Sequence, residues 1–193
     1  MFNNDEFSDS FGHIPEETFL KIKGISEFKK FDPHVQLDEL GKVPSKLYLL
    51  ISGVMRCYIT SESGKEFNKR FFFPMNFAGS LTALIKNAPS EVVYETITEC
   101  SLYEIDYKEL KQMCATDIVI SNLYTVILEK VFMRYEKRQL ELISMNASQR
   151  YLKLKEDIPN IDKLVPQYHI ASYLSVTPVQ MSRIRKKMKE SQD

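Results

Sequence analysis

Cysteine and histidine are scarce in this 193-residue sequence, and neither is spaced as a metal site requires. The cysteines Cys57, Cys100 and Cys114 lie far apart, which excludes a disulfide framework and a C-x-x-C redox or metal motif. The three histidines are equally scattered, and no H-E-x-x-H motif occurs. We therefore expect buried free thiols and no bound metal.

Long apolar runs and a basic N-terminus are also missing. No stretch approaches the roughly 18 consecutive apolar residues that span a bilayer, and the first residues are acidic and rich in asparagine. These absences predict a cytoplasmic protein without a membrane partner. No nucleophile–base pair or phosphate loop is recognisable either, so we expect no enzyme activity.

The formal net charge is zero, which by itself argues against a nucleic-acid partner. The charges are unevenly distributed, however. Residues 1–40 carry nine Asp/Glu against four Lys, whereas residues 151–193 carry eight Lys/Arg against five Asp/Glu. Five of those cations, with no acid among them, lie between Pro178 and Lys189. A basic surface is therefore expected only near the C-terminus.

The first part of the chain changes from helical to strand-like spacing. Residues 1 to about 30 have a helical pattern, and strand-like runs follow at 47–51, 54–60, 66–73 and 91–105. The pairs Ser52-Gly53 and Ser63-Gly64 mark tight turns. A short mixed segment at 77–87 predicts one or two helical turns. Several short strands with regular turns favour a compact barrel or jelly roll.

A long helix without Gly or Pro is predicted over 117–145, after a short one over 107–115. Apolar residues recur along it at steps of three and four. They are Ile120, Leu123, Ile127, Val131 and Leu142, mixed with Tyr124, Leu128 and Tyr135. Such a stripe is wide enough to cover the barrel on one side and meet a partner helix on the other. A single core helix is the alternative.

The segment from Gln167 to Met188 has the pattern of two short helices joined by a tight turn. Apolar residues share the inner faces, namely Ile170, Ala171, Leu174, Val176, Met181, Ile184 and Met188. Thr177 before Pro178 supplies an N-cap hydroxyl for the second helix. Val179, Ser182, Arg183 and Lys186 are left together on its outer face. A helix with apolar residues behind and cations in front suits the major groove of DNA.

This order of parts resembles the Crp/Fnr family of bacterial transcription regulators. The runs Tyr48-Leu49-Leu50-Ile51-Ser52-Gly53, Ser63-Gly64-Lys65-Glu66 and Asn76-Phe77-Ala78-Gly79 look like the glycine-marked landmarks of its cyclic-nucleotide-binding fold. The resemblance implies an α+β protein. A double-stranded β-helix (jelly-roll) sensor barrel with flanking helices would span 1–116, a dimerisation helix 117–145, and an all-α helix-turn-helix domain 146–193.

The helix pair departs from the family pattern in two ways. Ser175 stands where the family favours Gly, because the turn needs a left-handed backbone. A residue other than glycine in that conformation costs on the order of 1 kcal/mol. Only five residues follow Met188 in the sequence, which leaves no room for the β-hairpin wing that usually follows the recognition helix. We expect the affinity to depend more on dimerisation for that reason.

The barrel lacks the residues with which the cyclic-nucleotide branch binds its ligand. After Gly79, the position of the family's ribose-binding Glu is Ser80, the position of its phosphate-binding Arg is Ser90, and Glu91 follows. A carboxylate repels a phosphate, and Lys86 is the only nearby cation. No Cys precedes Cys57, which excludes the N-terminal iron–sulfur centre of the oxygen-sensing branch. The resemblance therefore implies neither cyclic AMP nor a cluster as cofactor.

An unidentified small-molecule effector would bind within the barrel. The candidate pocket residues are Phe71, Phe73, Phe77, Gly79, Ser80, Leu81, Lys86, Ser90, Glu91 and Tyr135. Aromatic residues at alternate strand positions more often belong to the hydrophobic core than line a ligand pocket. A barrel without any effector is therefore an open alternative.

As a member of this family the protein would be a homodimer that binds double-stranded DNA and contacts RNA polymerase. Arg183 is the candidate reader of a guanine, with Gln180 and Ser182 as secondary readers. The candidate phosphate contacts are Thr177, Arg185, Lys186, Lys187, Lys189 and His169. A ligand-binding or protein-interaction module whose helical tail never meets DNA is the competing hypothesis.

Overall fold

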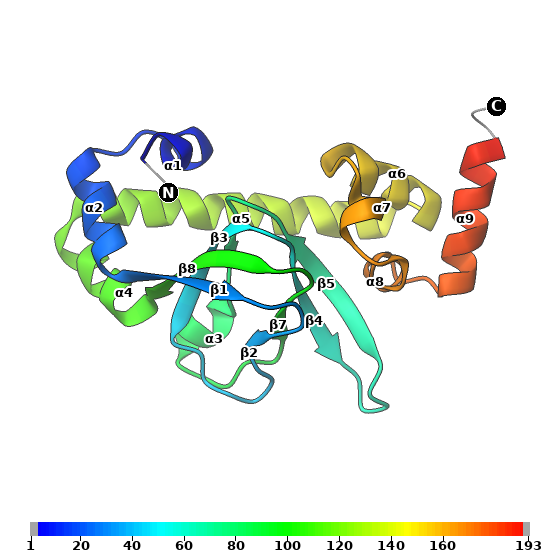
Figure 1. Cartoon of the computed structure of the whole chain (residues 1–193), viewed down its shortest axis with the longest axis horizontal. Helices are drawn as coiled ribbons and strands as arrows, with labels where there is room; N and C mark the ends of the chain where they lie inside the picture. Colours follow the sequence, from blue (N-terminus) through cyan, green and yellow to red (C-terminus); the bar gives the residue numbers. More distant parts are fainter. Residues whose placement is uncertain (1–3, 191–193) are drawn as a thin grey trace. The chain divides into compact units, whose positions relative to one another are not determined.

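The structure, a computed structural model, describes residues 4–190 and forms two compact units (Figure 1). The first unit consists of Met1–Cys57 and Phe71–Met133. The second consists of Tyr58–Arg70 and Arg134–Asp193. The units divide the chain at other places than the predicted domains, because the segment 58–70 joins the C-terminal helices.

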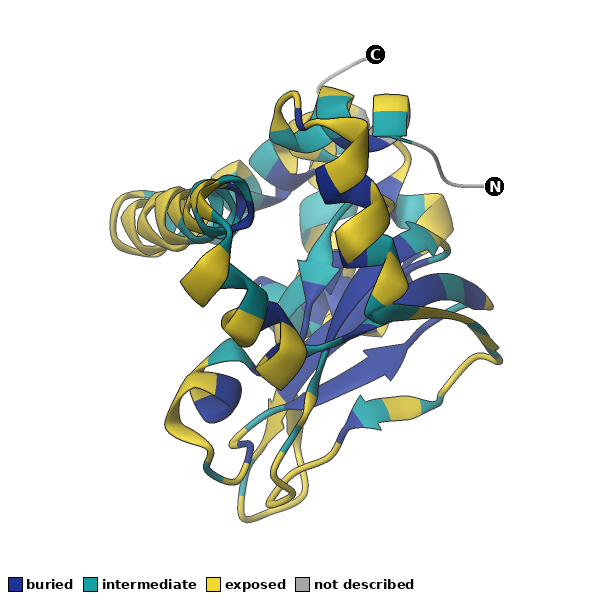
Figure 2. Cartoon of the chain, turned by 90° about the vertical axis from the view of Figure 1, so that its left-hand side faces the viewer, coloured by how far each residue is buried: buried dark blue, intermediate teal, exposed yellow. Residues whose placement is uncertain are grey.

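Two antiparallel four-stranded sheets form the barrel. One has the order β1-β8-β3-β6 and the other β2-β7-β4-β5. The strands are β1 (Ser26–Phe31), β2 (Gln36–Asp38), β3 (Lys46–Ser52), β4 (Met55–Thr60), β5 (Glu66–Phe72), β6 (Phe77–Ala78), β7 (Val93–Thr96) and β8 (Cys100–Asp106). Strand β8 lies between β1 and β3, and its residue Ile105 is opposite both Ser26 and Leu47. In Figure 2 these strands are coloured largely dark blue, the colour of buried residues.

Helices flank the barrel and close its core. They are α1 (Asn4–Phe11), α2 (Glu16–Gly24), α3 (Leu81–Lys86), α4 (Tyr107–Thr116) and the first part of α5 (Ile118–Ser144). Ile120 and Leu123 of α5 are buried in one cluster with Leu49 and Ile105 of the sheet. Burial of such side chains contributes roughly 1.5–3 kcal/mol each. A second apolar cluster includes Tyr48, Leu50, Met55 and Leu102.

The predicted α+β jelly roll with a long following helix is confirmed. The helical prediction for residues 1 to about 30 is wrong at its end, because residues 26–31 form β1. This strand pairs residue by residue with β8, from Ser26 opposite Ile105 to Phe31 opposite Cys100. A local pattern does not contain that pairing, since the partner lies about seventy residues away in the sequence.

The second unit holds the C-terminal helices α6 (Ala147–Asp157), α7 (Ile161–Leu164), α8 (Gln167–Tyr173) and α9 (Pro178–Glu190). Its fully buried side chains include Tyr151, Ile161, Ile170, Leu174 and Met181. Asn146 and Gln149 form a reciprocal capping box that starts α6. Within the described residues no helix is long and apolar enough to span a membrane.

Candidate nucleic-acid interface and barrel interior

Helices α8 and α9 pack through a dry apolar seam. Ile170, Ala171, Leu174 and Met181 are each no more than 1% exposed. The turn between the helices is closed by the Val176 N–H, which donates to the Ala171 carbonyl at 3.0 Å. Ser175 has φ 58°, so the turn is left-handed at a residue other than glycine, as its position predicted. The seam fixes which side of α9 faces outward.

A capping box begins α9. The Thr177 hydroxyl accepts from the Gln180 N–H at 3.2 Å, and the Gln180 side-chain oxygen accepts from the Thr177 N–H at 2.9 Å. The sequence T-x-x-Q carries this signal, although only the Thr177 cap was predicted from it. Both residues are thereby held at the helix start. The side-chain amide nitrogen of Gln180 can still donate to a ligand.

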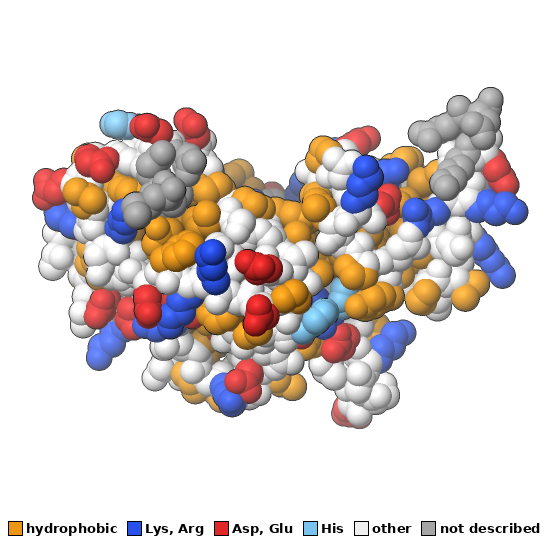
Figure 3. All heavy atoms as spheres, in the orientation of Figure 1, with side chains coloured by type: hydrophobic (Ala, Val, Ile, Leu, Met, Phe, Trp, Pro, Cys, Tyr) orange, Lys and Arg blue, Asp and Glu red, His pale blue; other side chains and the backbone are white. Residues whose placement is uncertain are grey.

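The outer face of α9 is exposed and cationic. Val179, Ser182, Arg183 and Lys186 lie on it, and all four are exposed. Figure 3 shows Lys and Arg side chains gathered over this helix. Lys187 is also exposed, whereas the side chain of Lys189 lies outside the described residues. The sequence therefore placed Val179, Ser182, Arg183 and Lys186 on one exposed helix face, and their contact with DNA stays a prediction.

Arg185 is only half exposed, unlike its neighbours on α9. Its guanidinium lies at the hydroxyl of Tyr151, where it opposes the rise in the pKa of Tyr151 that burial and Asp162 cause. The same hydroxyl donates to Asp162 at 2.7 Å. Arg185 therefore lies near Tyr151 of α6, and its phosphate contact stays a prediction.

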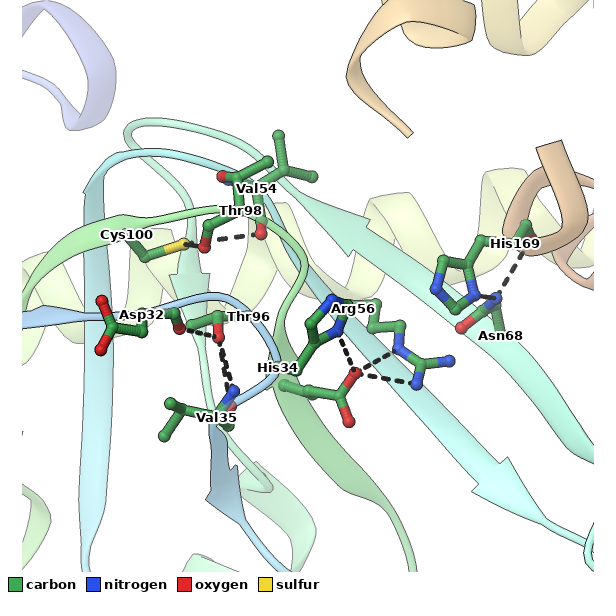
Figure 4. A network of polar contacts seen from close by, with 11 residues as sticks. Asp32, His34, Val35, Val54, Arg56, Asn68, Thr96, Thr98, Cys100 and His169 are labelled. Carbon is green, nitrogen blue, oxygen red and sulfur yellow. Dashed lines mark hydrogen bonds and ion pairs between the residues drawn. The ribbon is translucent and has the colours of Figure 1, made fainter. Parts of the chain in front are cut away.

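His169 is buried and does not lie on the exposed face of the helix pair, so its predicted phosphate contact is wrong. His169 is 5% exposed. The side-chain nitrogen of Asn68 donates to the His169 carbonyl and lies 3.1 Å from the His169 Nδ1 (Figure 4). One turn further on, the Ser172 hydroxyl donates to the Glu66 carbonyl at 3.0 Å and accepts from the Asn68 N–H at 2.9 Å. The first residues of β5 therefore support α8.

Two arginines that the sequence analysis did not single out hold the C-terminal end of α8. Arg138 donates to the Tyr173 carbonyl at 2.7 Å, and its guanidinium lies 4.1 Å from the centre of the Tyr173 ring. Arg150 donates to the Leu174 carbonyl at 2.9 Å and to the Met145 carbonyl at 2.6 Å. Carbonyls at a helix end lack partners within the helix. The two guanidinium groups satisfy them just before the left-handed turn.

Ser80 and Ser90, at the positions where the cyclic-nucleotide branch binds its ligand, are hydrogen-bonded to each other. The hydroxyls of Ser80 and Ser90 lie 2.8 Å apart, and that of Ser90 donates to the Val92 carbonyl. The Asp38 carboxylate accepts from the Ser80 N–H at 2.8 Å and from the Tyr48 hydroxyl at 3.2 Å. Asp38, Ser80 and Ser90 are all buried. The Asp38 carboxylate thus occupies the Ser80 N–H, which a ligand would otherwise use.

The other candidate pocket residues lie in different parts of the structure and differ in burial. Phe77 packs on Phe7 and Phe11 of α1, so its predicted place in the pocket is wrong. Tyr135 belongs to the second unit, where the Lys69 ammonium lies 5.2 Å from its ring centre. Lys86 and Glu91 are exposed, Phe71 is buried, and Phe73 and Leu81 are half-buried. A small apolar cavity lies elsewhere, lined by Phe7, Phe19, Ile22, Leu49 and Tyr103 among others.

A buried ion pair also lies inside the barrel. The guanidinium of Arg56 bonds the Glu95 carboxylate at 2.8 and 3.0 Å, and both side chains are almost fully buried (Figure 4). The charges compensate each other, so this arginine is engaged by the protein itself. Within residues 4–190, no group of three or more His, Cys, Asp or Glu could hold a metal ion.

Comparison with known proteins supports this geometry. The family model described as a cyclic nucleotide-binding domain matches residues 28–117. The CRP-like protein Clp of Xanthomonas campestris pv. campestris is 26% identical over 101 residues, which cover 52% of this chain and 44% of that protein. The matched region therefore spans less than half the length of these curated relatives.

Solved structures show the same fold over most of the chain. The c-di-GMP responsive global regulator CLP of Xanthomonas campestris has a TM-score of 0.72 at 19% identity, covering 92% of this chain and 93% of that one. A protein of Eubacterium rectale assigned to the Crp/Fnr family of transcriptional regulators also has a TM-score of 0.72, at 15% identity, covering 96% of this chain and 88% of that one.

The fold and the matched domain define a protein with a cyclic-nucleotide-binding-type barrel and a C-terminal helical domain. The solved structures that share this fold include a transcriptional regulator of the Crp/Fnr family, and the barrel is similar in sequence to the cyclic nucleotide-binding domain.

The clamp on α8 can be tested by replacing Arg150 with alanine. We expect Arg150→Ala to lower the free energy of unfolding of the C-terminal helices by about 1.5–3 kcal/mol, because buried carbonyls lose a charged donor. Lys153→Ala on the same helix removes only the exposed ion pairs with Glu156 and Asp157, and its effect should be much smaller. Urea unfolding followed by circular dichroism measures both. Equal effects would show that Arg150 does not clamp the turn.

The buried Asp38 should make stability depend on pH. Burial raises its pKa, with the hydrogen bonds from Ser80 and Tyr48 opposing the rise. A raised pKa means that folding favours the protonated form, so this residue's contribution is lost as pH rises from its unfolded value through its folded value. The free energy of unfolding of Asp38→Asn should therefore improve relative to the unmodified protein as pH rises above 3.8, the ordinary pKa of an aspartate side chain. Parallel pH profiles in urea unfolding would contradict this.

Proposed function

We propose that this protein is a homodimeric, sequence-specific DNA-binding transcription regulator of the Crp/Fnr type. The exposed cationic face of α9 above a dry apolar seam is the observation that carries the proposal. An exposed helix of this kind offers its first residues to base edges in the major groove and its cations to phosphates.

The roles of the side chains follow from their positions on α9. Arg183 is exposed in the middle of the outer face, where its planar guanidinium can bond both acceptors of a guanine. Ser182 and the free amide of Gln180 lie beside it as secondary readers. Thr177, Lys186, Lys187 and Lys189 serve as phosphate contacts, and Arg185 does so only with the part that Tyr151 leaves exposed.

The second copy would pack on the exposed face of α5. Ile118, Phe132 and Ile143 are 71%, 66% and 82% exposed, and their spacing of 14 and 11 residues places them on one stripe of a helix. Ile120 and Leu123 are buried on the opposite side. An apolar stripe left uncovered on a long helix is typical of a helix-pairing surface. Two such subunits would present their α9 helices to successive major grooves about 34 Å apart.

The barrel, in this proposal, does not bind cyclic AMP. A cyclic phosphate needs unpaired N–H donors and a cation, whereas here Asp38 occupies the Ser80 N–H and Arg56 is paired with Glu95. The partners that remain are DNA and RNA polymerase, in the cytoplasm, with an effector of different chemistry or none. We propose no bound cofactor and no enzymatic reaction.

A protein-interaction module is the second candidate. The exposed apolar stripe of α5 and the zero net charge favour it. In that case α9 would be a solvated helix end, and the chain would not bind DNA.

Binding to random duplex DNA separates the two candidates. We expect affinity at 50 mM salt that falls steeply with added salt, because each phosphate contact releases a counterion. On the cognate duplex, Arg183→Ala should cost about 1–3 kcal/mol and relax one base position, while Lys186→Ala should weaken all sequences alike. Fluorescence anisotropy measures these changes. Absence of binding at low salt would sink the regulator proposal.

Dimerisation through α5 can be tested by placing a charge on its apolar stripe. Ile143→Asp should shift the protein towards monomer, since an unpaired carboxylate would be buried between the copies. Leu20→Asp, at another exposed apolar position, on α2, serves as the control and should leave the mass unchanged. Sedimentation equilibrium gives the mass directly. If the unmodified protein is a monomer, the proposed dimer is wrong. If it is a dimer that Ile143→Asp does not affect, the interface does not lie on α5.

A further inference from the structure

Val179 is an exposed apolar residue in the middle of an otherwise polar surface. It is the second residue of α9 and is 62% exposed. The other exposed residues of this outer face are Ser182, Arg183 and Lys186. The inner face of the helix already contains its apolar contacts in Met181 and Ile184, so Val179 is not needed for the seam between α8 and α9.

The local structure holds Val179 in a defined position. The capping box between Thr177 and Gln180 fixes the first turn of the helix around it. A valine in a helix occupies one side-chain rotamer almost exclusively, so its two methyl groups point in a constant direction. Contact with a ligand would therefore cost little conformational entropy.

Val179 also lies beside the candidate base reader. Arg183 is four residues further along, so the two side chains are neighbours on one face, about 6 Å apart along the axis. A side chain at this distance from Arg183 meets the edge of a base pair one or two steps away. Thymine is the standard base that presents a methyl group in the major groove, and apolar side chains recognise it there.

We infer that Val179 is a specificity-determining residue that contacts the C5 methyl group of a thymine within two base pairs of the one read by Arg183. This inference rests on the proposed function and deepens it. Valine has no hydrogen-bonding group, so it selects through burial of the methyl alone. Burying one methyl group corresponds to roughly a fourfold change in affinity for each half-site.

Deoxyuridine substitution tests the inference, because it removes the thymine methyl and keeps every hydrogen-bonding group. The probe is the tightest duplex that the full chain selects from a random pool, with each thymine replaced in turn. We expect one symmetric pair of thymines to cost about fourfold per half-site with the unmodified protein. Val179→Ala should bind the thymine and deoxyuridine duplexes within twofold of each other. Val179→Thr, which keeps one methyl group, should retain part of the difference.

Two controls and two contrary outcomes complete the test. Leu152→Ala, an exposed apolar truncation on α6, should leave the deoxyuridine profile unchanged, and Arg183→Ala should weaken binding without abolishing the methyl dependence. If the protein binds DNA but no thymine distinguishes Val179→Ala from the unmodified chain, Val179 is not a methyl reader, although the proposed function stands. If no duplex binds at low salt, the proposed function fails together with the inference.

Discussion

Burial of Ile170, Ala171, Leu174 and Met181 is the constraint on which the C-terminal region depends. With these four side chains removed from water, α9 has a single possible inner face. The exposed position of Val179, Arg183 and Lys186 follows directly from that burial. The left-handed backbone at Ser175 costs on the order of 1 kcal/mol, which the seam offsets because burial of Ile170, Leu174 and Met181 contributes more than this for each side chain.

Polar groups around the seam determine where α8 lies within its unit. Asn68 and Glu66 of the β4–β5 hairpin bond α8 at His169 and Ser172, while Arg138 and Arg150 bond its last carbonyls. These are contacts to buried or half-buried groups, so losing one leaves a partner unsatisfied. The helix pair is consequently held at both ends of α8, while Val179, Ser182, Arg183 and Lys186 on the outer face of α9 stay exposed. A helix that reads a ligand needs that combination of a fixed base and an open surface.

The sequence predicted the parts whose signal is local. Apolar periodicity identified α5, α8 and α9, and the pairs Ser52-Gly53 and Ser63-Gly64 identified the turns between strands. The strand β1, the role of His169 and the contacts of Asp38 were beyond its reach, because each is decided by a partner forty to a hundred residues away. The apolar stripe of Ile118, Phe132 and Ile143 was missed for a different reason. Apolar residues occur on both the core-facing and the exposed side of α5. The sequence does not distinguish the two sides, whereas the burial of each residue in the structure does.

The barrel and the helix pair together make one physical claim, that two α9 helices related by a two-fold axis read DNA. Selection of duplexes from a random pool by the full chain tests this most directly. We expect an inverted repeat whose half-sites are centred about 10 base pairs apart, the spacing of successive major grooves. Enrichment of a single unrepeated site, or of no sequence at all at low salt, would contradict the claim.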